Sequence, residues 1–286
     1  MTISAKQVMD LRAATGMPMM KCKKALEAEG GDFEKAIDRL RKEGLKSAEK
    51  RAARTTGEGL VRVHISDDAK QGTMVAVACE TEPVARTEDF KNLVGRLMAH
   101  VEASKPADAE ALLGQPWIDD GAQTVDEVIR GLIAKIGENM RVQAVDHVAV
   151  DGGGLVGSYV HFNEKIGAMV ALNAEKVDER LAEVAKDLCM HIVFQKPAAL
   201  DRSEISPADA ERELAFFRSQ MQEDPKMANK PADVIEKIVQ GKLGAYFKER
   251  VLNEQAWIRD DKQTVQQVLK QHGASVAGFT LLQVGG

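Results

Sequence analysis

The side chains best suited to catalysis are scattered along this sequence. Cys22, Cys79 and Cys189 lie far apart, and no two of them have the C-x-x-C spacing of a zinc site or a redox motif. No two histidines are four positions apart, as metal ligands on one helix would be. The phosphate-binding motif G-x-x-x-x-G-K-S/T and the nucleophile motif G-x-S-x-G are both absent. The sequence therefore predicts no enzyme, no cofactor and no metal site.

Two histidines and one acidic cluster are the best remaining candidates for a functional site. The six histidines are scattered, and His161 and His191 are the best candidates among them because they stand beside the repeated apolar segments. Four acidic residues are clustered between positions 80 and 89, but the last two follow Thr87 and fit the first turn of a helix, where acidic charge is favourable. A histidine at such a position is more often packed or solvated than a metal ligand or a catalytic base.

Composition indicates a globular protein with more than one domain. The chain has 286 residues, of which 44% are apolar and 29% charged, and its net charge is -5. The acidic balance argues against a dedicated nucleic-acid-binding protein. No apolar run is long enough for a membrane span, and the start of the chain lacks the pattern of a signal peptide. With its few cysteines, we expect the protein to act in the reducing cytoplasm.

The first part of the chain, residues 1–45, predicts three short helices. Ser4 and Gln7 have the spacing of a capping box that opens the first helix. Asp32 is a typical N-cap for the third helix, and Gly44 is predicted to end it. Three helices of this length form a compact domain with a minimal core.

A basic segment, residues 46–58, follows this head. It carries Lys46, Lys50, Arg51 and Arg54 and almost no large apolar residue. We interpret it as a partly helical, solvated linker, because no aromatic side chains alternate with the cations. The alternative is a basic stripe that contacts RNA or an acidic partner.

The rest of the chain repeats itself, with one half at residues 59–150 and the other at 151–286. Each half reads strand, strand, helix, helix, strand, and the first two strands are expected to pair antiparallel. Two such units predict an α+β core of two pseudo-equivalent halves. The matching segments include Gly59-Leu60-Val61 with Gly154-Leu155-Val156, Trp117-Ile118 with Trp257-Ile258, and Gln123-Thr124-Val125 with Gln263-Thr264-Val265.

The second half contains an insertion at about residues 204–250. Pro106 and Trp117 are 11 positions apart, whereas Pro197 and Trp257 are 60 apart, so the insertion adds 60 − 11 = 49 positions. Its apolar spacing predicts two helices that form a hairpin. The apolar stripe either seals these helices together or forms a surface for a dimer or another partner.

Several motifs resemble the elongation factor Ts family, in order and along the whole chain. They are the segments Leu11–Gly16 and Met19–Leu26 in the head, the segment Cys79–Phe90, the triplet Lys165-Ile166-Gly167 after His161, and Met190-His191-Ile192. The resemblance implies a UBA-like three-helix head, a duplicated α/β-sandwich core of antiparallel half-repeats and an inserted helical hairpin.

The resemblance also implies a function. Members of this family bind elongation factor Tu·GDP, displace its magnesium ion and promote GDP release during translation elongation. The head would dock on the nucleotide domain, the segment after Cys79 would wedge beside the magnesium site, and the second half would grip elsewhere on the partner. The hairpin would form a homodimer or a second contact. The implied contact residues are Arg12, Met19 and Met20 in the head, Thr81, Glu82, Pro83 and Val84 in the wedge, and His161 and His191 in the second half.

One departure from the family pattern concerns the wedge. The family sequence is Thr-Asp-Phe-Val, and here Glu82-Pro83 replaces the Asp-Phe pair. An aromatic ring brings a large buried area to an interface, while proline brings a rigid turn. We therefore expect weaker exchange than in a typical relative. The alternatives are a paralogue that only holds the GTPase and an RNA-binding adaptor built around the basic segment.

Overall fold

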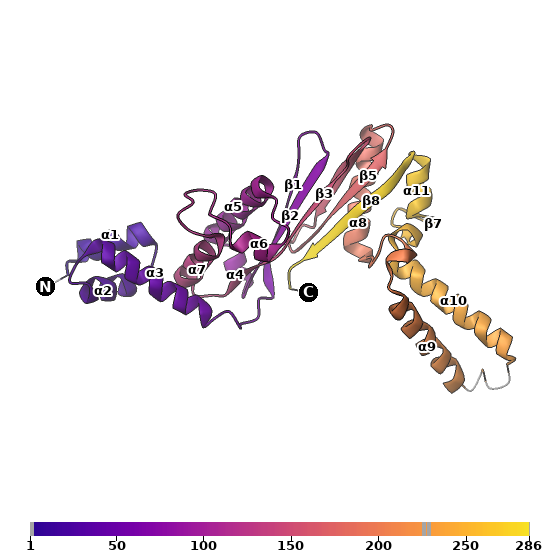
Figure 1. Ribbon diagram of the computed structural model, residues 1–286, viewed down its shortest axis with the longest axis horizontal. Coiled ribbons are helices and arrows are strands. Elements are labelled where there is room, and N and C mark those ends of the chain that lie inside the picture. The colour runs from indigo at the N-terminus through magenta and orange to yellow at the C-terminus, as the bar shows by residue number, and fades with distance from the viewer. Residues whose placement is uncertain (1–2, 225–226, 228–229, 286) are drawn as a thin grey trace.

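The protein is elongated, with a helical head at one end, a sandwich in the middle and a helical hairpin that projects from the other end (Figure 1). The computed structural model describes residues 3–224, 227 and 230–285. It confirms the predicted α+β class. Within the described residues, no helix is long and apolar enough to cross a membrane.

The head consists of α1 (Ala5–Thr15), α2 (Met19–Ala28) and α3 (Phe33–Glu49). The predicted capping box is present, because the Ser4 hydroxyl accepts from the backbone of Gln7 and the Gln7 side chain accepts from the backbone of Ser4. Asp32 caps α3 as predicted. A small core lies between the three helices and includes Val8, Leu11, Cys22, Leu26 and Leu40.

The prediction that Gly44 ends the third helix is wrong. Helix α3 continues to Glu49, so both the head boundary at residue 45 and the start of the linker at 46 fall inside it. Gly44 is buried where α3 crosses α7 (Val125–Ile136), and a Cβ at this position would lie 2.9 Å from the Cβ of Ala134. The glycine therefore allows two helices to approach closely, which fixes the head against the core.

The core contains two three-stranded antiparallel sheets with the same strand order. In the first sheet, β2 lies between β1 and β3, and in the second, β5 lies between β4 and β8. The strands are β1 (Glu58–Ile65), β2 (Gln71–Cys79), β3 (Met140–Ala149), β4 (Gly154–Val160), β5 (Ile166–Ala174) and β8 (Ala274–Gln283).

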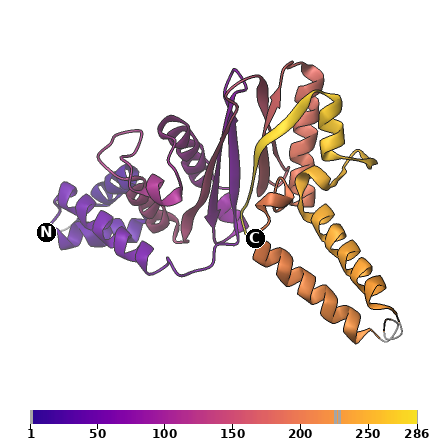
Figure 2. The same ribbon diagram turned by 45° about the vertical axis from the view of Figure 1, so that its right-hand side comes forward.

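The two sheets pack face to face, with helices on the outer faces (Figure 2). Val61, Met74 and Met169 belong to the buried cluster between the sheets. The first sheet is covered by α5 (Glu88–Ser104), α6 (Ala109–Leu113) and α7, and the second by α8 (Glu179–Gln195) and α11 (Val265–Gln271). The sandwich thus follows the predicted duplication.

Matching hydrogen bonds join the two halves across the sandwich. The Val61 N–H donates to the Glu164 carbonyl at 2.7 Å, and the Val156 N–H donates to the Ala69 carbonyl at 2.7 Å. Both acceptors stand in the turn between the first two strands of the opposite half, and both have a positive φ. The same backbone hydrogen bond therefore joins the halves twice, with each half donating once and accepting once.

The insertion forms the predicted hairpin of α9 (Pro207–Glu223) and α10 (Ala232–Arg250). Met221 and Val239 are buried, and an ion pair of 2.9 Å joins Arg218 to Glu236 across the two helices. Pro225, which the sequence predicts as the helix breaker with Asp224, lies outside the described residues. Short elements flank the hairpin and lead back to the core: η1 (Arg202–Glu204), η2 (Leu252–Glu254), β6 (Ala256–Trp257) and β7 (Asp260–Thr264).

Candidate partner-binding site

The segment predicted as a wedge is a single helical turn, α4 (Glu82–Ala85), rather than a loop. Thr81, Glu82 and Pro83 are exposed. Val84, which the family resemblance implies as a partner contact, is only 8% exposed and packs in the core of the first half. The turn presents a carboxylate and a proline ring to solvent and uses Val84 as its anchor.

The α4 turn is an addition to the first half. Eight residues, 80–87, join β2 to α5, whereas four residues, 175–178, join β5 to α8, a difference of 8 − 4 = 4. Thr87 and Asp178 cap the following helices in the same way. The extra length therefore lies before the cap, where α4 stands.

A buried thiol supports the start of the turn. Cys79, the last residue of β2, donates a hydrogen bond from its thiol to the Thr81 carbonyl at 3.3 Å. Burial raises the pKa of Cys79 to about 12, and the nearby Glu138 carboxylate contributes in the same direction. The thiol therefore keeps its proton and acts as a donor to the backbone of the turn.

The predicted contact residues of the head are on the surface. Arg12 is exposed on α1, and Met19 and Met20, in the first turn of α2, are 41% and 61% exposed. The opposite face of α2 packs into the head core through Cys22 and Leu26. Two adjacent methionines on a surface provide an adaptable apolar contact for another protein.

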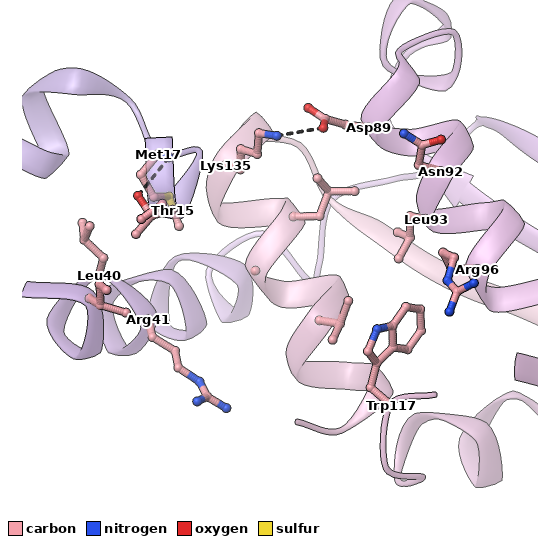
Figure 3. Close-up of a pocket in the computed structure, with 15 residues that line it drawn as sticks. Thr15, Met17, Leu40, Arg41, Asp89, Asn92, Leu93, Arg96, Trp117 and Lys135 are labelled. Carbon is pink, nitrogen blue, oxygen red and sulfur yellow. Dashed lines mark hydrogen bonds and ion pairs between the residues drawn. The ribbon is translucent and has the colours of Figure 1, made fainter. Parts of the chain in front are cut away.

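A cleft that the sequence did not reveal separates the head from the first half (Figure 3). Its volume is about 450 Å³. Thr15, Met17 and Leu40 line it from the head, and Leu93 and Trp117 line it from the core. The cleft combines α1, α3, α5 and α7, which are distant in the sequence, so no local motif could have indicated it.

Charged side chains surround this apolar cleft. Lys135 of α7 pairs with Asp89 of α5 at 2.7 Å, and Figure 3 shows this pair at the edge of the cleft. Arg96 pairs with Asp119 near Trp117. An apolar floor with a polar rim is the usual anatomy of a protein interface.

His161 lies in the turn between β4 and β5, half-buried, with its Nδ1 3.0 Å from the Tyr159 hydroxyl. The next residue, Phe162, is 87% exposed, and its ring centroid is 4.4 Å from that of His161. Sequence analysis did not identify Phe162, although a phenylalanine in a short polar turn was a usable signal. The pair forms an exposed aromatic surface.

His191, which the family resemblance implies as a partner contact, does not reach the surface of this structure. It is fully buried, its Nε2 is 2.9 Å from the Gln255 Oε1, and its ring stacks on Trp257 at 5.8 Å. Burial lowers the pKa of His191 and outweighs the opposing effect of the hydrogen bond that its ring donates to Gln255. The side chain is a neutral part of the core.

The first half contains the same arrangement. The His100 Nε2 is 2.9 Å from the Gln115 Oε1, and the ring stacks on Trp117 at 5.8 Å. The sequence contained the signal, because His100 and His191 occupy the same position in the repeated helices. A histidine present in both halves indicates a structural role.

Two cations of the basic segment form contacts within the molecule. The Arg51 guanidinium donates to the Gly137 carbonyl at 2.9 Å, and Arg54 pairs with Glu80 at 3.3 Å. Lys46 and Lys50 are exposed. Two of the four cations therefore fix the chain between head and core, which argues against the RNA-adaptor hypothesis.

The α4 turn and the His161 turn lie at the same end of the sandwich. Lys165, in the second turn, forms an ion pair with Glu58, and Glu58 stands opposite Cys79 in the first sheet. Cys79 leads directly into the α4 turn. The structure thus brings together two of the predicted contact sets, one from each half.

Comparison with known proteins identifies relatives over almost the whole chain. Residues 80–286 match the family model described as elongation factor TS. A protein named elongation factor Ts from Cytophaga hutchinsonii is 41% identical over 285 residues, which cover 99% of this chain and 99% of the relative. Its namesake from Hydrogenovibrio crunogenus is 40% identical over 285 residues, covering 100% and 92%, and that from Clostridium kluyveri is 40% identical over 274 residues, covering 96% and 88%.

Proposed function

The chain belongs to the elongation factor Ts family, and on that premise we propose that it binds elongation factor Tu·GDP and promotes GDP release during translation elongation. The observation that carries the proposal is the α4 turn. It occurs in only one of the two repeated halves, and it presents Glu82 and Pro83 on a base that is fixed in the core.

The proposed contact extends from the head to the second half. Met19 and Met20 dock the head on the partner, and the apolar cleft beside Trp117 receives part of the same surface. His161 and Phe162 add a contact at the end of the sandwich where α4 stands. A contact spread over separate points holds α4 in a defined orientation on the partner.

The mechanism requires no bond-making chemistry from this chain. Magnesium in nucleotide sites is held by phosphate oxygens, one or two carboxylates and water. A carboxylate such as Glu82, brought beside such a site, repels the phosphates and disturbs the coordination of the ion. If the chain prefers the nucleotide-free partner, it must weaken GDP binding by the same factor by which GDP weakens its own binding. Such a role places the protein in the cytoplasm and makes it a binding protein rather than an enzyme.

Release of a fluorescent GDP analogue from elongation factor Tu tests the proposal. We expect the release rate to rise by at least about tenfold when the chain is added, which corresponds to a coupling in the usual allosteric range. Binding measured by gel filtration without acceleration would refute the exchange role and support the alternative of a holding partner.

A further inference from the structure

The connection between α7 and β3 contacts both the head side of the molecule and the α4 turn. It consists of Gly137, Glu138 and Asn139. Asn139 is 4% exposed, and Glu138 is half-buried. Each of the three residues forms a hydrogen bond to a segment that is distant in the sequence, so we name residues 137–139 the junction.

On the head side, the junction binds the chain that follows α3. The Asn139 amide donates to the carbonyls of Ala52 at 3.3 Å and Arg54 at 2.9 Å. The Gly137 carbonyl accepts from the guanidinium of Arg51 at 2.9 Å. These bonds attach the end of the head to the core at the point where α7 ends.

On the other side, the junction binds the start of the α4 turn. Glu138 accepts from both donors of Thr81, with its Oε2 3.1 Å from the backbone nitrogen and its Oε1 2.8 Å from the hydroxyl. The backbone N–H of Asn139 donates to Glu80 at 2.6 Å. Thr81 occupies the N-cap position of α4, but its hydroxyl donates to Glu138 and forms no capping hydrogen bond.

The second half has no counterpart of this junction. There, only His272 and Gly273 connect α11 to β8, and neither has a carboxylate or a side-chain amide. The second half also has no α4 turn. The junction and the turn therefore occur together in the half that also contacts the head.

We propose that Glu138 and Asn139 are positioning residues that hold the α4 turn at a fixed place relative to the head. Docking of the head then sets the position of Glu82 and Pro83 on the partner. This inference rests on the proposed exchange function and adds to it the residues that connect the two contact regions.

Substitution of Glu138 tests the inference in the full-length chain. Hydrogen bonds to a charged group are strong enough that Glu138→Ala should lower the maximal rate of GDP release about tenfold, with the half-saturating concentration changed by less than about twofold. Glu138→Gln should recover much of the rate, because its carbonyl oxygen still accepts one bond from Thr81. The matched control is Glu183→Ala on the exposed face of α8, which should leave both parameters unchanged.

A double variant tests whether Glu138 acts through Thr81. Thr81→Val removes the hydroxyl donor, so its effect should not add to that of Glu138→Ala. In the free protein, Glu138→Ala should also speed amide exchange at Ala85 and Arg86, whose N–H groups donate within the turn.

Three results would overturn the inference. The first is an unchanged maximal rate in a folded Glu138→Ala protein, which would leave Glu138 with a structural role at most. The second is a full addition of the two single effects. The third result is that the unmodified chain does not accelerate GDP release. It would refute the proposed function and this inference together. The measurement on the unmodified chain therefore distinguishes this result from the other two.

Discussion

The two halves of the core use the same parts at matching positions. Each half stacks a buried histidine on a tryptophan and bonds it to a glutamine. Each half also has an ion pair between its long helix and the segment after the tryptophan, but with the charges exchanged. Arg96 pairs with Asp119 in the first half, and Asp187 pairs with Arg259 in the second.

The differences between the halves include the α4 turn and the junction in the first and the hairpin in the second. Where the halves agree, the shared residues have a structural role. His191 is an example, because a histidine could act in catalysis but this one is packed in the core. Among the segments that differ, the α4 turn presents Glu82 and Pro83 to solvent. We therefore expect the added segments, rather than the residues that both halves share, to carry the function.

The largest expected effect is a loss of stability, and it tests the architecture that the two halves share. Gly59 has φ 146° and Gly154 has φ 139°, and a Cβ on either would lie 2.1 Å or 2.0 Å from a backbone oxygen of the neighbouring strand. Gly59→Ala and Gly154→Ala should each lower the free energy of unfolding by roughly 3 kcal/mol, because both strain and overlap oppose them. Chemical denaturation measures the free energy of unfolding of each variant.

The control for these variants is Gly95→Ala in α5, where an added Cβ meets no heavy atom within 4 Å. It should raise the free energy of unfolding by about 0.5–1 kcal/mol, because alanine is the better helix former. Unequal losses in Gly59→Ala and Gly154→Ala would show that the halves are not energetically equivalent.

A smaller loss of stability is expected when the buried histidines are replaced. His191→Leu and His100→Leu each leave the oxygen of a glutamine without its donor, so each should cost about 1–3 kcal/mol of unfolding free energy. Neither should change the maximal rate of GDP release at a temperature where the protein is folded. A specific loss of release in His191→Leu would restore this residue as a partner contact.

We also expect the stability of the folded protein to depend on pH because of His191. Burial lowers its pKa below 6.5, so the unfolded chain takes up a proton when the pH falls below about 6.5 while the folded chain does not. Stability contributed by the neutral side chain is therefore present above this pH and is lost as the pH falls further. Thermal melts from pH 7.5 to 5.5 should show a smaller decline in His191→Leu.

A smaller effect tests the α4 turn. Pro83→Phe adds an aromatic ring at an exposed position of the turn and should raise the maximal release rate several-fold, in keeping with the roughly 1 kcal/mol that an aromatic contact supplies. The matched control is Val177→Phe in the corresponding connection of the second half, where Val177 is also exposed. An equal gain in both variants would contradict a special role for α4.

The smallest effect concerns the exchanged ion pair. Arg96→Asp alone places two acidic groups together, and the double variant with Asp119→Arg rebuilds the pair in the orientation of the second half. Because the pair is exposed, we expect the single change to lower the melting temperature by no more than about two degrees and the double change to restore it. Differential scanning calorimetry measures both.

Periodicity and capping signals were sufficient to predict much of this fold. The repeated apolar runs and the Gln-Thr-Val motifs identified the duplication, and the structure has a capping box at both Thr124 and Thr264. These signals are local, because a cap or an alternating strand depends on residues a few positions apart. The predicted class and the hairpin followed from them.

The errors came from residues whose role depends on distant contacts. Gly44 fits the end of a helix as well as it fits a close crossing, and only its contact with Ala134 decides between them. Val84 and His191 belong to motifs of a binding family, but a motif does not show which way a side chain points. The junction was missed because Thr81 and Glu138 are 57 positions apart.

We propose that α4 drives GDP release while the rest of the surface holds the partner. The most direct measurement is stopped-flow release of a fluorescent GDP analogue with the unmodified chain and with a variant in which residues 81–86 are replaced by Lys-Val, the pair found at 176–177. A milder variant, Glu82→Ala with Pro83→Ala, changes only exposed side chains. The account predicts that both variants still bind elongation factor Tu, with release slowed by roughly tenfold or more. Unchanged release in folded proteins that bind normally would contradict it.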